Sequence, residues 1–136
     1  MIDSFTGKYK FLSNFYMIDG WSVEHYYQAN KATSDEGYNF VMAASTASEA
    51  KKRGRSLEIR SDWEKIKVGI MLECLITKFK YKELEKKLLD TGNEVLVEGN
   101  YWHDNFWGNC TCNKCKNIKG LNKLGKLLMF IRWVKQ

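Results

Sequence analysis

The sequence contains no proline among its 136 residues and has few cysteines. Proline interrupts helices and is common in linkers, so its absence leaves helical segments unbroken and argues against a Pro-rich linker. No apolar run approaches the roughly 20 residues of a membrane-spanning helix, and the N-terminal segment lacks the apolar core of a signal peptide. We therefore expect a cytoplasmic protein that does not associate with a membrane.

The composition bounds the kind of protein and the kind of partner. Hydrophobic residues make up 44% of the chain and charged residues 28%, which is enough apolar material for one packed core. The length fits a single domain, so we expect one domain over residues 1–136. Lys and Arg total 22 against 16 acidic residues, a net charge of +6. This balance favours an anionic partner such as a nucleotide, a phosphorylated metabolite or nucleic acid.

Periodicity and capping signals predict a predominantly helical α+β fold with a few short strands. Extended structure is expected at residues 9–23, with a turn at Asp19-Gly20, and at residues 94–98. The expected helices span residues 24–32, 35–44, 46–54, 62–80, 82–90 and a last segment that begins near residue 122. Ser34 or Asp35 is expected to cap the second helix. Thr46 with Glu49 forms a capping box for the third, Gly54 is expected to stop it, and Asn122 to cap the last.

Residues 98–109, EGNYWHDNFWGN, combine acids with large aromatic rings. Rings of this kind cover the faces of bases and sugars and exclude water. Carboxylates beside such rings hold protons more tightly and act as general acids or bases. The segment therefore indicates a ligand site, and the alternative is an aromatic turn that closes the core while its acids stay solvated. The residues concerned are Glu98, Tyr101, Trp102, His103, Asp104, Phe106 and Trp107.

In the expected helix 24–32, Glu24, Gln28 and Lys31 share one face at positions i, i+4 and i+7. Spacing alone favours solvated surface decoration. Four residues upstream that can wall a cleft favour a site instead, because a lysine in a dry pocket loses its proton more readily and becomes a nucleophile toward a sugar carbon. These upstream residues are Ser13, Asn14, Phe15 and Trp21.

Two basic segments are phosphate-binding candidates. Residues 50–56, AKKRGRS, place Lys51, Lys52, Arg53 and Arg55 around Gly54, and Arg60 precedes Asp62-Trp63. The forked guanidinium group matches phosphate oxygens well. The ordinary alternative is a solvated basic helix end.

Three of the four cysteines lie close together in CTCNKC, residues 110–115. Structural zinc usually takes two C-x-x-C pairs separated by a longer loop, and only one such knuckle is present. We therefore expect no metal and reduced loop thiols at Cys110, Cys112 and Cys115. The alternative is a zinc site in which His103 or Cys74 supplies the fourth ligand.

Six segments in the same order resemble the NADAR, or YbiA-like, superfamily from near the first residue to near the last. They are FLSNFY (11–16), VEHYYQANKA (23–32), AKKRGR (50–55), RSDWEKIKVGIM (60–71), LVEGNYWHDNFWG (96–108) and GLNKLGKLLMFIR (120–132). The resemblance implies a YbiA-like fold and hydrolysis of an N-glycosidic bond on a ribose that bears phosphate, without a cofactor. The loop between Gly108 and Gly120, with its cysteine knuckle, is a departure that only part of the family shares.

The resemblance also implies roles for individual residues. Glu24, Lys31 and Asp104 are the expected catalytic residues, with Glu98 as the alternative carboxylate, and which carboxylate is the acid and which the base stays open. Lys31 can instead attack the anomeric carbon and form an imine. The expected substrate-binding residues are Ser13, Asn14, Phe15, Gln28, Arg53, Arg55, Trp63, Glu98, Trp102, Trp107, Gly108 and Asn122.

Four functions follow as hypotheses. The first is an ADP-ribosyl glycohydrolase that removes ADP-ribose from guanine in nucleic acid, and the second is a hydrolase of ribosylamino intermediates of riboflavin biosynthesis. The third is a non-catalytic module that binds ADP-ribose or a nucleotide, which would not need both Glu24 and Lys31. The fourth is a zinc-knuckle nucleic-acid adaptor built on residues 103–115.

Overall fold

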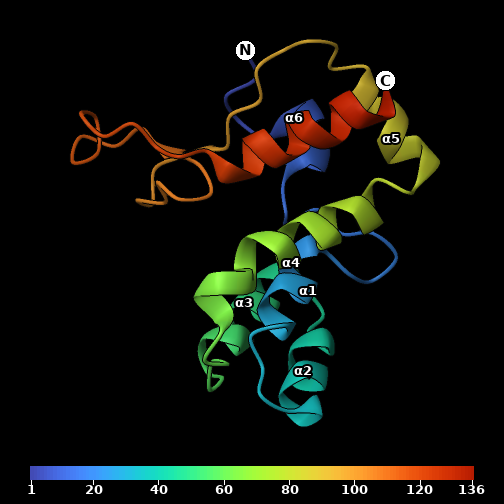
Figure 1. The fold of residues 1–136 in the computed structure, drawn as a ribbon, viewed down its shortest axis with the longest axis vertical. Coiled ribbons are helices and arrows are strands. Elements are labelled where there is room, and N and C mark those ends of the chain that lie inside the picture. Colours follow the sequence, from blue (N-terminus) through green and yellow to red (C-terminus); the bar gives the residue numbers. More distant parts are fainter. The chain divides into compact units, whose positions relative to one another are not determined.

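The computed structural model describes all residues, 1–136, and the chain forms two compact units. The helical unit comprises residues 14–78, and the mixed unit comprises residues 1–13 and 79–136. The helical unit contains α1 (Val23–Ala29), α2 (Asp35–Met42), α3 (Ala47–Arg55) and α4 (Trp63–Lys78) (Figure 1). The mixed unit contains the 3-10 helix η1 (Gly7–Leu12), α5 (Lys82–Leu89), β1 (Gly99–Asn100), β2 (Asn109–Cys110) and α6 (Lys123–Lys135). The prediction of a predominantly helical α+β fold is confirmed.

Within the helical unit, α1 is the central element and contacts α2, α3 and α4. Three of these helices begin at a hydroxyl cap. The side chains of Ser22, Ser34 and Thr46 accept hydrogen bonds from the backbone N–H groups of His25, Gly37 and Glu49. Each cap satisfies one of the unpaired donors of a first helical turn and contributes about 1 kcal/mol. The predicted caps at Ser34 and Thr46 are confirmed.

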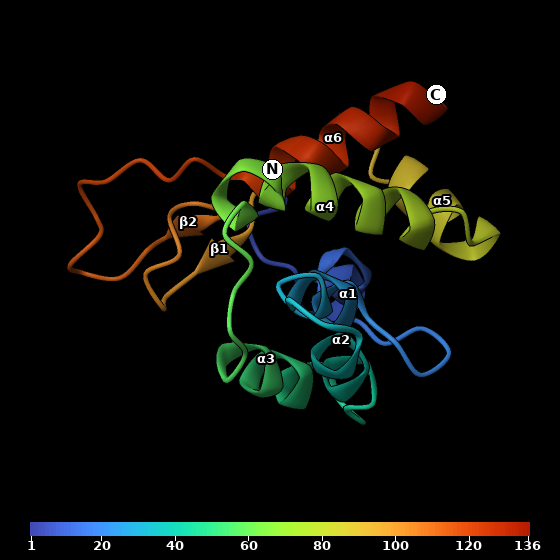
Figure 2. The ribbon, with the colours of Figure 1, turned by 60° about the horizontal axis from the view of Figure 1, so that its bottom comes forward.

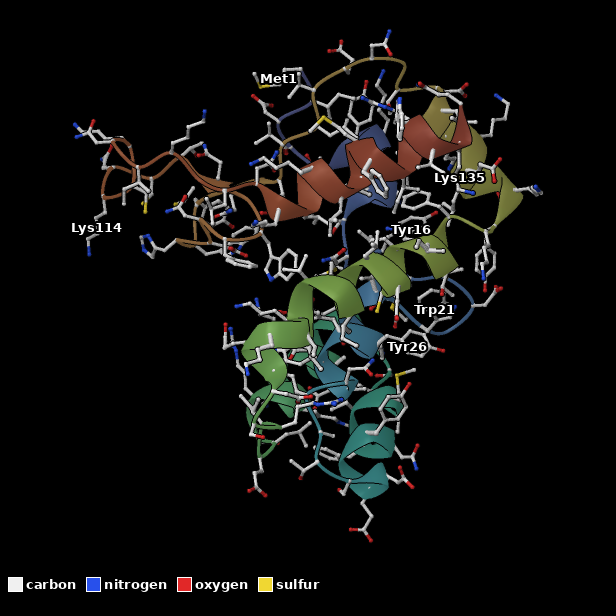
Figure 3. All side chains as sticks on the ribbon, in the orientation of Figure 1. Met1, Tyr16, Trp21, Tyr26, Lys114 and Lys135 are labelled. Atoms are coloured by element: carbon white, nitrogen blue, oxygen red, sulfur yellow. The ribbon has the colours of Figure 1, made fainter.

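The turn at Asp19-Gly20 is also confirmed. Both residues have positive φ angles, 48° and 86°, and Ile18 and Trp21 exchange backbone hydrogen bonds of 2.7 and 3.0 Å across it. The centroids of the Trp21 and Tyr26 rings lie 5.0 Å apart in an edge-to-face arrangement. Figure 3 shows these two side chains next to each other. The turn therefore leads the chain directly into α1.

Two predictions in this part of the chain are wrong. Residues 9–12 belong to η1 rather than to an extended segment. The adjacent Phe11 and Leu12 are both buried there, a pattern that a strand with one buried face does not produce. Gly54 does not stop α3, which continues to Arg55, because the glycine is a point of close helix approach rather than a left-handed terminator.

In the mixed unit, β1 and β2 form a parallel pair in which Gly99 lies opposite Asn109 and Asn100 opposite Cys110 (Figure 2). The strand expected at residues 94–98 is reduced to an isolated bridge between Leu96 and Ile2. Ile2 accepts from Val97 and donates to Val95, at 2.8 Å in each case. Since the N-terminal segment contributes only Ile2 to this pairing, a regular ladder does not form.

Helix α6 packs Leu124, Leu128 and Ile131 into the core. Asn122 precedes it with left-handed backbone angles, φ 50° and ψ 43°, and its side chain makes no cap hydrogen bond. The predicted capping role of Asn122 is therefore wrong, because its amide is used elsewhere in the unit. No helix of the structure combines the length and the apolar character needed to cross a membrane.

Candidate active site

Glu24 of α1 is a buried carboxyl group. Only 6% of the residue is exposed, and its Oε1 accepts a hydrogen bond of 2.9 Å from Nε2 of Gln28, one turn along the helix. Burial raises the pKa of Glu24 above its ordinary value, while the bond from Gln28 and the positive charges of Lys51, Lys31 and Arg55 act in the opposite direction. A carboxyl group held in this way exchanges a proton nearer to neutral pH than an exposed one.

Lys31 lies just beyond the end of α1, in a tight turn where its backbone N–H donates to the carbonyl of Gln28 at 3.2 Å. Its Nζ lies 5.5 Å from the ring centroid of Tyr27 and 5.9 Å from that of Trp63. Burial lowers the pKa of Lys31 most, Glu24 opposes this, and the neighbouring cations Arg55, Lys51 and Lys67 lower it further. The net lowering of the Lys31 pKa increases the fraction of neutral, nucleophilic amine.

Three further cations complete this cluster, and we call them the cationic group: Lys51 and Arg55 of α3 and Lys67 of α4. All three act electrostatically on Lys31, and the two from α3 also act on Glu24. The Nζ of Lys51 lies 5.7 Å from the ring centroid of Phe15. A concentration of positive charge beside aromatic rings suits a phosphorylated ligand.

The other two arginines among the predicted phosphate ligands are engaged elsewhere. The Nη1 of Arg53 donates to the carbonyl of Phe40 at 2.8 Å, and its guanidinium lies over the Phe40 ring at 4.8 Å. Arg60 forms a two-point ion pair with Asp62, at 2.6 and 3.0 Å. Hydrogen bonding from Arg60 lowers the pKa of Asp62. Arg55 is therefore the arginine of this region that belongs with Glu24 and Lys31.

Two buried oxygen atoms near Glu24 have no hydrogen-bond partner: Oδ1 of Asn14 and Oε1 of Gln28. Asn14 is tied to the same place through its backbone carbonyl, which accepts from the Glu24 N–H at 3.0 Å. Leaving a buried acceptor unsatisfied costs about 1–3 kcal/mol. The Oδ1 of Asn14 is thus an unsatisfied acceptor beside Glu24, whereas the Oε1 of Gln28 lies against Gly54 of α3.

His25, the residue after Glu24 on α1, has a structural role. It is fully buried, its Nε2 lies 2.8 Å from the carbonyl oxygen of Ala44, and its Nδ1 lies 2.7 Å from Oγ of Ser22. The carbonyl can only accept, so Nε2 carries the proton and Nδ1 accepts from the serine hydroxyl. Both ring nitrogens are therefore used inside the core of the helical unit.

Asp104, in the mixed unit, closes a turn in the aromatic segment. Its Oδ1 accepts from the backbone N–H groups of Phe106 at 3.1 Å and Trp107 at 2.9 Å. Its backbone carbonyl accepts from Nδ2 of Asn100 at 2.8 Å. The two bonds to Oδ1 fix the orientation of the carboxylate, and Oδ2 takes no part in them. The rings of Phe106 and Trp107 meet edge to face at 4.9 Å.

Glu98, Gly108 and Asn122 form the framework of that segment. The amide of Asn122 accepts from the Glu98 N–H at 3.0 Å and donates to the carbonyl of Leu96 at 2.9 Å. Nδ2 of Asn100 donates to the Glu98 carboxylate at 3.1 Å. A Cβ at position 108 would overlap the side chain and backbone of Glu98, so only glycine fits there. These contacts position the backbone of the segment.

The remaining expected substrate residues differ in their surroundings. Trp102 is 51% exposed and pairs edge to face with the still more exposed Tyr101 at 5.1 Å. Ser13 ends η1, where its N–H donates to the carbonyl of Lys10 at 3.0 Å. Phe15, by contrast, lies under Lys51 in the helical unit.

Two residues of the cluster, Tyr27 and Lys67, were not predicted from the sequence, and Lys51 was predicted only within a basic segment and not as an individual binding residue. Helical spacing carries a signal for two of them, because Tyr27 lies four residues before Lys31 and Lys67 four residues after Trp63. Lys51 was recognised as part of a basic segment without being separated from its neighbours. Only the packing of α3 distinguishes it from the exposed Lys52.

Comparison with known proteins shows the family of this chain. A model of the NADAR domain matches residues 4–134. An N-glycosidase of Nostoc punctiforme is 42% identical over 117 residues, which are 82% of this chain and 71% of that protein. The N-glycosidase YbiA of Escherichia coli K12 is 35% identical over 121 residues, which are 85% of this chain and 72% of that protein. The NMR structure of E. coli YbiA matches with a TM-score of 0.78 at 32% identity, over 98% of this chain and 83% of that one.

A riboflavin biosynthesis protein, PYRR of Zea mays, is 36% identical over 124 residues, which are 82% of this chain but only 19% of the maize protein. The class defined by the fold and these relatives is that of hydrolases acting on N-glycosyl bonds. Within that class, the chain belongs to the NADAR domain family.

Proposed function

We propose that this protein hydrolyses the N-glycosidic bond between a base nitrogen and the anomeric carbon of a phosphorylated ribosyl group. The observation that carries the proposal is the pairing of Glu24 with Lys31. A buried carboxyl with a raised pKa and a half-buried amine with a lowered pKa influence each other beside the rings of Tyr27 and Trp63. Perturbed groups of complementary type in one place are typical of catalytic sites.

The reaction needs stabilisation at two points. As the C–N bond breaks, positive charge develops on the anomeric carbon and the electron pair passes to the base nitrogen. In our proposal, the carboxyl of Glu24 donates the proton that the nitrogen of the departing base takes up. Water forms the new bond to the anomeric carbon and gives up a proton to a second carboxylate, for which we propose Asp104, whose Oδ1 is fixed by its turn in the mixed unit.

Lys31 supports a covalent route as well. Its neutral amine attacks the anomeric carbon, the bond to the base breaks, and the sugar ring opens to leave an imine with Nζ. The two protons that leave the amine end on the base nitrogen and on the ring oxygen. Water then adds to the imine carbon, which releases the ribosyl product as an aldehyde and restores the amine. The lowered pKa of Lys31 favours this nucleophilic role.

The rest of the cluster serves binding in this proposal. Arg55 and Lys51 hold phosphate, Trp63 and Phe15 cover the sugar or base, and the free acceptor of Asn14 receives a hydroxyl or amino donor, while Gln28 holds Glu24. Trp102 and Trp107 are proposed to contact the base. No cofactor enters either route.

Two substrates contain the required group, and each is favoured by one observation. ADP-ribose attached to guanine in nucleic acid is favoured by the net charge of +6 and by the cationic group, since this substrate carries a diphosphate and a polyanionic chain. A ribosylaminopyrimidine phosphate, a riboflavin-pathway intermediate, is favoured by the similarity to the maize protein PYRR.

The test incubates the protein separately with an ADP-ribosylated guanine oligonucleotide and with the ribosylaminopyrimidine phosphate, and follows release of the base by chromatography. We expect one substrate to be consumed and Glu24→Gln and Lys31→Ala each to abolish its turnover while circular dichroism stays unchanged. Lys52→Ala is the control, because Lys52 is an exposed lysine of α3 outside the cationic group, and its loss should leave the rate unchanged.

Borohydride reduction during turnover distinguishes the two routes. Trapping of the ribosyl group on the wild-type chain and not on Lys31→Ala supports the imine. Near-parental rates in both Glu24→Gln and Lys31→Ala, with intact folds, would show that the active site is elsewhere.

A further inference from the structure

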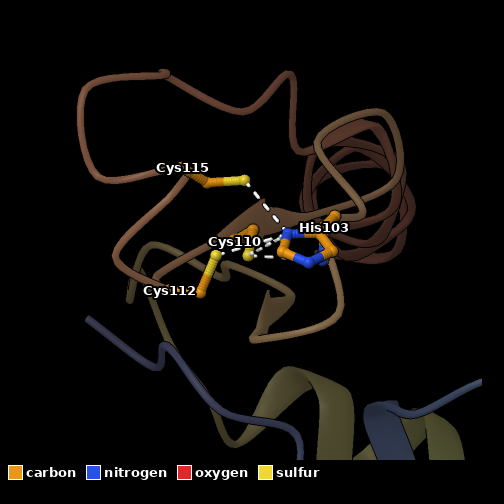
Figure 4. Close-up of side chains that lie close together, drawn as sticks. All are labelled: His103, Cys110, Cys112 and Cys115. Atoms are coloured by element: carbon orange, nitrogen blue, oxygen red, sulfur yellow. Dashed lines mark hydrogen bonds between the residues drawn. The ribbon is translucent and has the colours of Figure 1, made fainter.

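His103, Cys110, Cys112 and Cys115 come together in the mixed unit, at the segment that precedes α6. One potential ligand atom from each residue lies within 4.8 Å of all the others. Nδ1 of His103 lies 3.3 Å from the sulfur of Cys112, 3.4 Å from that of Cys115 and 4.0 Å from that of Cys110. The close-up shows the imidazole facing the three sulfurs (Figure 4). We propose that these four side chains form a structural zinc site.

The distances match those of a tetrahedral zinc centre. Zn–S bonds of about 2.3 Å and a Zn–N bond of about 2.0–2.1 Å place neighbouring ligand atoms roughly 3.5–3.8 Å apart. The three distances from Nδ1 span this range. All four ligand atoms lie within 4.8 Å of one another, so a zinc ion is accommodated once the most widely separated sulfurs move about 1 Å closer together.

The donor set selects the metal. Three thiolates and an imidazole are soft or borderline ligands that favour Zn²⁺ over Mg²⁺ or Ca²⁺, which prefer oxygen. Four protein ligands fill a tetrahedral shell and leave no position for water or substrate, so the site is structural rather than catalytic. The four cysteines of the chain are all free, and no disulfide competes for these sulfurs.

The backbone around the cluster supports it. The N–H of His103 donates to the sulfur of Cys110 at 3.3 Å, a bond that stabilises a thiolate ligand. His103 has a φ angle of 68°, in the left-handed region that residues other than glycine seldom adopt. The Cys110 N–H is held by Oδ1 of Asn105 at 2.9 Å, and the Cys115 N–H closes a turn on the carbonyl of Cys112 at 3.0 Å.

The loop at residues 111–119 needs such an anchor. Cys115 is its only buried residue, and Ile118, its only aliphatic one, is 52% exposed. Lys114 lies at its outer end (Figure 3). Since apolar burial does not fix this loop, a metal that joins Cys112 and Cys115 to His103 and Cys110 supplies the missing constraint. The metal also fixes His103, which is adjacent to Asp104 in the sequence.

Metal analysis of the protein as purified, without added zinc, tests the proposal independently of activity. We expect one zinc ion per chain for the wild type and none for Cys112→Ser, Cys115→Ser and His103→Ala. Cys74→Ser is the matched control, since Cys74 is a buried cysteine of α4 in the helical unit and should leave the zinc content unchanged.

Cobalt substitution gives a second readout if the serine variants fail to fold. The wild type should show thiolate-to-cobalt charge-transfer absorption and the intense visible bands of tetrahedral Co²⁺. Chelation should lower the thermal midpoint, and Zn²⁺, not Mg²⁺, should restore it. The proposal is overturned if the reduced wild type binds no zinc, if Cys112→Ser and Cys115→Ser keep a full equivalent, or if bound cobalt gives an octahedral spectrum.

Discussion

Gly54 of α3 lies directly against the side chain of Gln28 of α1. A Cβ at position 54 would lie 2.7 Å from the Cβ of Gln28 and would overlap its Oε1. The same glutamine donates through Nε2 to the carboxyl of Glu24. The absence of a side chain at position 54 therefore allows α3 to approach α1 closely enough to fix Glu24 and to bring Lys51 and Arg55 beside it.

Gly54→Ala should disturb both stability and activity. The added methyl group must displace Gln28 or separate the helices, so we expect a loss of about 1–3 kcal/mol in the free energy of unfolding. Turnover should fall with it, because Glu24 loses its hydrogen-bond donor. Urea unfolding and initial rates measure the two effects.

Gly69→Ala on α4 is the control for this substitution. A Cβ there meets open space, so the change should stabilise the helix by roughly 0.5–1 kcal/mol and leave the rate unaltered. A Gly54→Ala variant with wild-type stability and rate would show that the contact with Gln28 has no such importance.

Arg55→Ala should weaken substrate binding more than Arg53→Ala. Arg55 belongs to the cationic group, whereas Arg53 is held by the carbonyl and ring of Phe40. Loss of a hydrogen bond to a charged phosphate costs about 1.5–3 kcal/mol, which is roughly a 10–100-fold rise in KM. Steady-state kinetics measure this rise, and thermal unfolding should detect a change mainly for Arg53→Ala. Equal KM values for the two variants would remove Arg55 from the phosphate site.

Glu24 should make the protein less stable as the pH rises. Its pKa is raised in the folded state above the ordinary value of 4.5, so between these two values the folded state holds a proton that the unfolded state has lost. The free energy of unfolding therefore falls through that window and levels off above the folded-state pKa. Glu24→Gln cannot ionise and should lack this fall. Urea titrations of both proteins across pH give the difference, and parallel curves would contradict the assignment.

Asp104→Asn and Asp104→Ala distinguish the structural role of Asp104 in its turn from its proposed catalytic role. Asparagine keeps an oxygen that accepts from the N–H groups of Phe106 and Trp107, so this variant should retain the wild-type unfolding midpoint. Alanine removes the acceptor and should lower the stability by about 1 kcal/mol. If Asp104 is the second carboxylate, both variants lose turnover by about 100-fold or more. An active Asp104→Asn variant would leave Asp104 with a purely structural role.

Much of the local structure follows from short-range signals. Ser34 and Thr46 cap their helices as predicted, because a hydroxyl at that position reaches the N–H of the next turn regardless of the rest of the fold. Asp19-Gly20 forms its turn because both residues tolerate positive φ. Glu24 and Gln28 share a helix face for the same kind of reason, since 3.6 residues per turn place i and i+4 together.

Other predictions fail where the same residue type serves two purposes. A glycine after a basic helix end is typical of a helix terminator, but Gly54 remains helical. A glycine is needed there because Gln28 occupies the space that a side chain would take. An asparagine before α6 reads as a cap, but the amide of Asn122 is turned toward Leu96 and Glu98. Each outcome depends on a partner distant in sequence, which no local pattern specifies.

Local patterns were enough to predict the helical α+β class, most helix ends and the presence of acids, an amine and cations in recognisable segments, because backbone geometry and periodicity act over a few residues. They did not predict which basic side chains accompany Glu24 and Lys31, or which residue joins Cys110, Cys112 and Cys115. Those choices depend on how separate segments pack, and burial and charge act on a side chain through its neighbours in space rather than along the chain.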